Sequence, residues 1–187
     1  MIIEDGTGSG NKVKVTGNRL QVAREDEALN ATLNGDAYIL HIDAVTIDTA
    51  DYLIALMING DTAERDMIVT QIVISPNTSD DDGCVEVNLG GTFTSTVANS
   101  TATTPFNQKS GCIKEAGGSY YVNDGSGDMT TEANAYVGYS QKKGIKNTPM
   151  NMRVAGGWVI PFGSSISVSA DKDDKFFGCM HFYFRDA

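Results

Sequence analysis

The sequence predicts an all-β fold, an antiparallel β-sandwich of the jelly-roll type with extra hairpins and a flexible N-terminal arm. Apolar and polar residues alternate with a period of two along most of the chain, turn signals recur about every 8–12 residues, and no long segment has the period of a helix. A length of 187 residues with 41% hydrophobic content suits one domain with a real core. We therefore expect residues 1–12 to form the arm and residues 13–187 to form a single sandwich domain.

The first third of the chain starts with the arm and continues into strands. Three glycines among polar residues predict the arm, and its "GTGSG" lacks the flanking strand and helix of a dinucleotide-binding loop. Residues 23–35 have room for one helical turn, which Asn34-Gly35 ends. Alternation predicts strands over residues 12–15, 18–22, 37–42, 49–60 and 66–75. The fourth of these is too uniformly apolar to have a solvated face, so we expect it to lie centrally and to end at the turn signal Asn59-Gly60-Asp61.

The remaining chain alternates between loops and short strands. Residues 76–83 predict a loop, and residues 94–111, rich in small and β-branched residues, predict an exposed edge or a long loop. Further strands are predicted over residues 84–93, 119–122, 133–139, 153–162, 165–170 and 179–184. The total is about ten or eleven strands, which fits a jelly roll of eight core strands with additional hairpins. The pattern does not determine the order of the strands in the sheets.

The closing strand presents two faces, because successive side chains of a strand point to opposite sides. We expect the core side to hold Met180, Phe182 and Phe184. We expect the second side, a surface for subunit contact, to hold Cys179, His181 and Tyr183. Burying the core set stabilises the fold by about 1.5–3 kcal/mol for each fully buried side chain.

The charge balance excludes partners that need a basic surface. The chain has 14 Lys and Arg against 24 Asp and Glu, a net charge of −10, whereas nucleic acids and anionic membranes attract cationic proteins. No apolar stretch reaches the roughly 20 residues of a membrane helix, and the start has neither the basic nor the apolar region of a signal peptide. Three cysteines without a CxxC motif leave at least one thiol unpaired, which suits a reducing cytoplasm. We expect no nucleic-acid partner, no membrane and synthesis in the cytoplasm.

Candidate catalytic and metal-binding residues are few. His41 and His181 are the two imidazoles, and the chain has no G-x-S-x-G elbow and no recognisable nucleophilic cysteine. We expect no enzyme and no catalytic residue; a hydrolase that uses one of these histidines as its base is the competing hypothesis. Asp80 and Asp82 in "SDDDG" are weak calcium candidates, as are the carboxylates of residues 171–174, because neither loop has EF-hand spacing. The cysteines and histidines lack zinc-site spacing, so we expect no metal and no cofactor.

A glycan- or cell-surface-binding β-sandwich module is the alternative function. Such modules stack sugars on exposed aromatic rings, and the sequence offers Tyr120, Tyr121 and Tyr139 for this purpose. Trp158 alternates with Ile160, which favours a position in the core or in a subunit contact. The candidates for an interface or for ligand contact are therefore Tyr120, Tyr121 and Trp158.

Four segments of the chain carry a resemblance. They are "NKVKVTGNRLQV" (11–22), "AREDEALNATLNGDAYIL" (23–40), "VTIDTADYLIALMINGDTAERDMIVTQIVIS" (45–75) and the ending "GCMHFYFRDA". Within them, the central elements are residues 18–22, Gly35-Asp36-Ala37-Tyr38 and Asn59-Gly60-Asp61. This pattern resembles the virion structural proteins of tailed bacteriophages, of the head-decoration, head-fibre and capsid-associated β types. Residues 76–150 carry no such resemblance.

The resemblance implies a non-enzymatic structural protein of the virion. Such a protein is a symmetric oligomer, often a homotrimer, that binds the major capsid protein or other virion proteins and cements capsid contacts. It is located in the virion after synthesis in the host cytoplasm. The glycine-rich arm and the Ser/Thr-rich residues 94–111 suit segments that become ordered in an oligomer.

Overall fold

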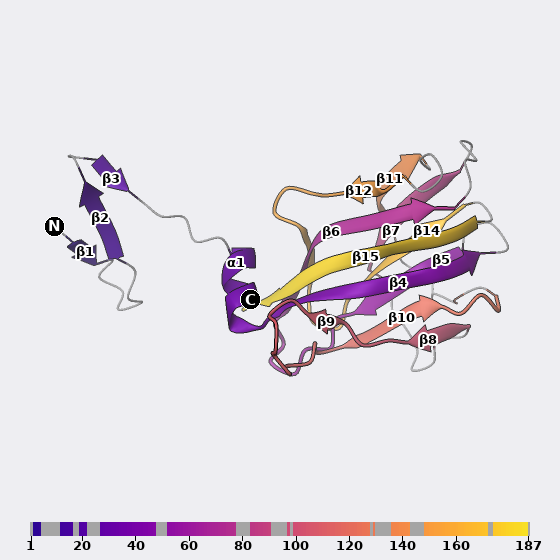
Figure 1. The fold of residues 1–187 in the computed structure, drawn as a ribbon, viewed down its shortest axis with the longest axis horizontal. Helices are drawn as coiled ribbons and strands as arrows, with labels where there is room; N and C mark the ends of the chain where they lie inside the picture. The colour runs from indigo at the N-terminus through magenta and orange to yellow at the C-terminus, as the bar shows by residue number, and fades with distance from the viewer. Residues whose placement is uncertain are drawn as a thin grey trace.

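The computed structural model describes residues 2–4, 12–16, 19–21, 27–47, 52–77, 83–90, 97, 99–127, 129, 136–142, 148–171 and 174–186. Two antiparallel sheets pack face to face (Figure 1), which confirms the predicted all-β sandwich. The sandwich strands are β4 (Ala37–Ile47), β5 (Tyr52–Ile58), β6 (Asp66–Pro76), β7 (Cys84–Leu89), β8 (Ser100–Ala102), β9 (Phe106–Asn107), β10 (Ser119–Asn123), β11 (Tyr136–Lys142), β12 (Met150–Met152), β13 (Trp158–Ile160), β14 (Ser165–Ala170) and β15 (Asp174–Arg185).

The strand order is that of a jelly roll with additions. One sheet, which we call the β15 sheet, has the order β12-β6-β15-β4-β9, with β13 also paired to β6. The other, the β14 sheet, has the order β11-β7-β14-β5-β10-β8. The chain crosses between the sheets at each step from β4 to β7, and β14 and β15 then insert between strands laid down earlier. The extra strands β8, β9 and β10 come from the segment between β7 and β11 and extend the edges formed by β4 and β5.

The core lies between the two sheets and is aromatic at its centre. The predicted inward set of the closing strand, Met180, Phe182 and Phe184, is buried, as expected. The ring of Phe182 stacks on Tyr38 of β4 and on Tyr120 of β10, each with 5.5 Å between centroids. Because β10 belongs to the opposite sheet, this stack joins the two layers directly.

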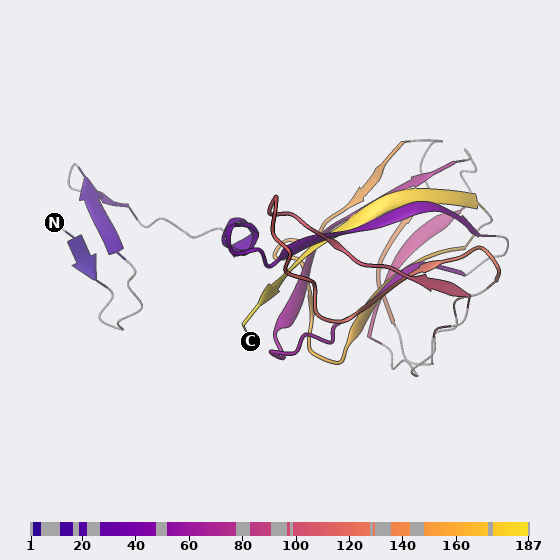
Figure 2. The same ribbon diagram turned by 60° about the horizontal axis from the view of Figure 1, so that its bottom comes forward.

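The N-terminal strands form a sheet of their own. β1 (Ile2–Glu4), β2 (Lys12–Thr16) and β3 (Arg19–Gln21) pair with each other, and Figure 2 shows them apart from the sandwich. The first strand of the two packed sheets is β4, which begins at Ala37, and the division into residues 1–12 and 13–187 stays a prediction. The outermost strands of the two large sheets are β8, β9, β11 and β12.

One helix, α1 (Glu27–Asn34), occupies the place where a single helical turn was expected. It ends at Asn34 as predicted, because Gly35 adopts a φ of 75°. The N–H groups of Gly35 and Asp36 donate to the carbonyls of Thr32 and Ala31, closing a Schellman motif. The helix is longer than expected because Ala31 packs against Ala37, Ile68 and Tyr183, a contact between distant segments.

Candidate functional site

The outward side of the β15 sheet is the most distinctive surface of the described chain. α1 covers one end of it, over Ile68 and Tyr183, and this side faces the viewer in Figure 1. Beyond the helix, large apolar side chains stay exposed: Phe106 at 65%, Val159 at 47% and Phe177 at 38%. We call this uncovered area the outer face, defined by Ile39, His41, Asp43, Val73, Phe106, Val159, Lys175, Phe177, Cys179 and His181. Exposed apolar side chains that gather into one patch are typical of contact surfaces.

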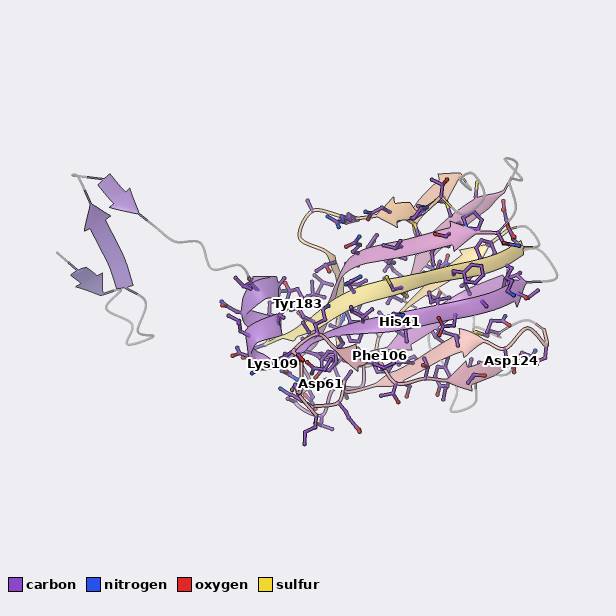
Figure 3. The ribbon with its side chains drawn as sticks, viewed as in Figure 1. His41, Asp61, Phe106, Lys109, Asp124 and Tyr183 are labelled. Atoms are coloured by element: carbon purple, nitrogen blue, oxygen red, sulfur yellow. The ribbon has the colours of Figure 1, made fainter. Side chains whose placement is uncertain are left out.

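Both histidines and one cysteine lie on the outer face. The Sγ atom of Cys179 is 3.4 Å from Nε2 of His181 on the same strand. The register places His41 of β4 directly opposite Cys179, and the His41 ring meets Phe106 edge-on with centroids 5.3 Å apart (Figure 3). The sequence "CMH" already places Cys179 and His181 on one side of a strand, but only the pairing of β4 with β15 brings His41 beside them.

Burial acts on the pKa values of Cys179 and His181. Burial raises the pKa of the Cys179 thiol. Burial, with smaller effects from Arg153 and His41, lowers the pKa of His181. In the part of the chain that the structure describes, neither imidazole is hydrogen-bonded to a carboxylate. Both shifts favour the neutral thiol and the neutral imidazole, whereas a nucleophilic Cys–His site uses a thiolate–imidazolium pair.

An ionic cluster lies at the end of the sandwich near α1. Arg65 donates to both carboxylate oxygens of Asp61, at 2.9 and 3.0 Å, and to Oδ1 of Asp36 at 2.8 Å. Lys114 also donates to Asp36, and the Arg65 guanidinium lies 5.1 Å from the ring centre of Phe184. The cluster ties the entry to β4, the turn after β5 and the segment before β10 into one corner.

These contacts lower the pKa values of the two aspartates in the cluster. The hydrogen bond from Arg65 holds the pKa of Asp61 below its ordinary value, although burial acts in the opposite direction. Burial also tends to raise the pKa of Asp36, but the hydrogen bonds from Lys114 and Arg65 together lower it. Both carboxylates come from elements that carry the resemblance, and the Asp61–Arg65 spacing of four was visible in the sequence. Lys114 had no such signal.

The turn signal Asn59-Gly60-Asp61 ends β5, as predicted. The Asn59 side chain is fully buried there, and its amide nitrogen donates to the carbonyls of Arg65, at 2.8 Å, and Ile160, at 2.9 Å. Its Oδ1 accepts from the Asp61 N–H at 3.2 Å. A buried amide with three partners fixes this corner, so these resemblance residues have a structural role.

A shallow pocket of about 250 Å³ lies beside β8 and β10. It is lined by Ala102, Thr103, Thr104, Pro105, Glu115, Ala116, Gly118, Ser119, Tyr120 and Tyr121. Hydroxyl groups, one carboxylate and an aromatic ring thus meet at one hollow, which suits a small polar ligand.

The structure separates the three aromatic candidates. Tyr120 is buried, and its hydroxyl donates to the Gly117 carbonyl at 2.7 Å. Trp158 is also buried in the main core, as its alternation favoured. Tyr121 is half-buried and lines the pocket. Both Tyr120 and Tyr121 line the pocket, and an interface or ligand-contact role stays a prediction for all three residues.

The calcium candidates Asp80 and Asp82 lie outside the described residues. Asp171 and Asp174 of the second acidic loop are described, and both hydrogen-bond to backbone N–H groups. Oδ1 of Asp171 accepts from Cys84 at 2.5 Å, and Oδ1 of Asp174 accepts from Lys175 at 2.7 Å. Both carboxylates thus accept a backbone hydrogen bond, Asp171 from the start of β7 and Asp174 from the next residue of β15.

No family model matches the chain, and the searches of curated proteins and of solved structures find no match either. None of the helices in the described ranges is long and apolar enough to cross a membrane. The candidate surfaces are therefore interpreted from their own chemistry and from the resemblance of the sequence.

Proposed function

We propose that the chain is a non-enzymatic structural protein of a bacteriophage virion, a capsid decoration or head-fibre subunit. It assembles as a symmetric oligomer through the outer face. The observation that carries this proposal is the exposure of Phe106, Val159 and Phe177 on the outward side of the β15 sheet, part of which α1 already covers. A sheet face that is meant to stay in water is normally polar.

The charge distribution supports self-association at this face. The chain has a net charge of −10, so two copies repel each other over most orientations. Lys175 lies on the outer face, with its Nζ 5.8 Å from the ring centre of Phe177, and Arg153 is close enough to lower the pKa of His181. Copies that approach through this face meet less repulsion, and the apolar side chains contribute to the roughly 800 Å² per partner that a stable contact needs.

The fold and the resemblance support the same proposal from different directions. Jelly rolls of two packed sheets recur in viral capsid domains, and they recur in lectins and cupins too. Fold alone does not decide function. The resemblance of residues 11–75 and of the closing strand to phage virion proteins favours the structural role over a glycan-binding module and over a hydrolase.

The test is the absolute mass of the purified chain in solution, measured by light scattering with and without a chelator. A trimer has three times 20.0 kDa, about 60 kDa. We expect a closed oligomer of this kind that is indifferent to chelation. A mass near 20.0 kDa at all concentrations, or an oligomer that dissociates on chelation, contradicts the proposal.

The pocket favours a second candidate, a glycan- or cell-surface-binding module. Tyr121 and Glu115 line it together with the hydroxyls of Thr103, Thr104 and Ser119, and sugars bind through ring stacking and hydrogen bonds to such groups. Tyr121→Ala should abolish retention on a glycan array while the melting temperature changes little. If the wild-type chain binds no glycan on the array, this candidate is excluded.

A further inference from the structure

Three metal-ligating side chains come together on the outer face, although they are far apart in sequence. Cys179 and His181 are two residues apart on β15, so they point to the same side. His41 lies opposite Cys179 on the adjacent strand β4. Thiolate and imidazole are the ligands that zinc prefers in proteins.

The distance between the first two groups fits a shared ion. Zinc lies about 2.3 Å from sulfur and about 2.0–2.1 Å from nitrogen, so two such ligands of a tetrahedral ion are about 3.5 Å apart. Sγ of Cys179 and Nε2 of His181 are 3.4 Å apart. The separation of these two atoms therefore matches that of two ligands of one ion.

The third group needs a rotation. The His41 ring now contacts Phe106, and in the present side-chain positions no three His, Cys, Asp or Glu residues of the described ranges are gathered around one point. Directly opposite residues of an antiparallel pair have Cβ atoms about 4.5–5.5 Å apart. Turning the exposed His41 side chain from Phe106 toward Cys179 brings its ring within reach of the same ion.

We propose that Cys179, His181 and His41 form a zinc site on the outer face, with water at the fourth position. Zinc displaces the thiol proton, which passes to solvent, and the two neutral imidazoles donate their lone pairs. Arg153 disfavours a cation here through its charge, whereas the exposed Asp43, two residues beyond His41 on the same strand, favours one. All three ligands belong to one chain, so the site does not depend on assembly.

Cobalt(II) is the probe, because a cobalt–thiolate bond gives a near-ultraviolet charge-transfer band that reports sulfur ligation. We expect the reduced wild-type chain to bind one cobalt ion, to show this band and to lose it when zinc is added. Cys179→Ser should abolish the band. His181→Ala and His41→Phe should each weaken binding by about tenfold or more, since even outer-shell changes at metal sites cost that much. Cys84→Ser and Cys112→Ser are the matched controls and should keep the band.

A second measurement does not depend on variants that must fold. At a dilution at which light scattering shows the wild-type chain as a monomer, so that assembly does not itself shield the outer face, zinc should protect Cys179 from alkylation, as identified by peptide mass, and should leave Cys84 and Cys112 as reactive as before. Absence of the cobalt band in the wild type, its persistence in Cys179→Ser, or equal reactivity of Cys179 with and without zinc overturns the proposal. None of these results alters the mass expected for the oligomer.

Discussion

The two sides of strand β15 share one backbone and differ in almost everything else. On the inward side, Met180, Phe182 and Phe184 are buried in the main core. On the outward side, Phe177 is 38% exposed and Cys179 and His181 are partly open to solvent, while α1 covers Tyr183. Alternation along a strand thus gives this chain a core and a candidate functional surface from the same twelve residues.

The comparison separates stability from function. The inward residues contribute to folding through packing, so their substitution should change the free energy of unfolding. The outward residues make few contacts within the chain, so their substitution should change association or ligand binding and leave folding almost intact. Substitutions of packed and of exposed residues, from the largest expected loss of unfolding free energy to the smallest, test this division.

Phe182→Ala should lower the free energy of unfolding by about 3–5 kcal/mol, near the top of the range for a buried phenylalanine. The reason is that its ring stacks on both Tyr38 and Tyr120 and joins the two sheets. Phe177→Ala on the same strand is the matched control and should cost less than about 1 kcal/mol. Urea unfolding monitored by circular dichroism measures both, and equal losses contradict the assignment of faces.

Arg65→Met should cost about 3 kcal/mol, because it leaves Asp61 without its main partner and removes one of the two cations that contact Asp36 in a largely buried corner. Arg185→Met is the control. Its ion pairs with Glu27, at 3.4 Å, and Asp66, at 3.6 Å, are more exposed, so their loss should cost at most about 1 kcal/mol. The same urea titration measures the free energy of unfolding of both variants. An Arg65→Met variant that loses no more than the Arg185→Met control would mean that the cluster does not fix the corner.

Acid should destabilise the chain through the same cluster. The folded pKa values of Asp36 and Asp61 are lowered, so the unfolded state binds more protons, and this contribution is complete above the ordinary aspartate pKa of about 3.9. It is lost as the pH falls from about 4 through the lower folded values. Unfolding free energy measured against pH should fall less steeply in Asp61→Asn than in the wild type. Parallel curves for the two proteins contradict this.

Tyr183→Phe should have the smallest effect, a loss of about 1 kcal/mol. Its hydroxyl donates to Oε2 of Glu27 at 3.1 Å and so holds the first turn of α1 on the β15 sheet. Faster amide exchange within α1, with unchanged exchange in β15, is the expected signature. Unchanged exchange in α1 would mean that packing of Ala31 alone positions the helix.

The sequence predicted the fold class because the period of two and the turn residues act locally. The closing strand's inward set and the end of β5 just before Asn59 followed from the same local signals. The order of the strands could not be predicted from local signals, because β14 and β15 pair with strands more than a hundred residues earlier in the chain. The separate sheet of β1–β3 was missed because alternation does not say which edge a strand joins.

The candidate site was predictable only in part, for the same reason. "CMH" placed Cys179 and His181 on one face, but His41 joins them only through the register of β4 against β15. Tyr120 and Trp158 looked available as aromatic residues, and tertiary packing buries both. The second turn of α1 likewise depends on packing against Ile68 and Tyr183, residues that no local sequence pattern connects to Ala31.

The most direct test of the account is the solution mass of a chain with Phe106→Ser and Phe177→Ser together. Both residues are exposed on the outer face, so we expect the double variant to melt like the wild type but to have the monomer mass of 20.0 kDa. Phe162→Ser, which changes a phenylalanine that is 50% exposed in the β13–β14 turn, is the matched control and should keep the oligomer. A double variant that retains the wild-type mass would contradict assembly through the outer face.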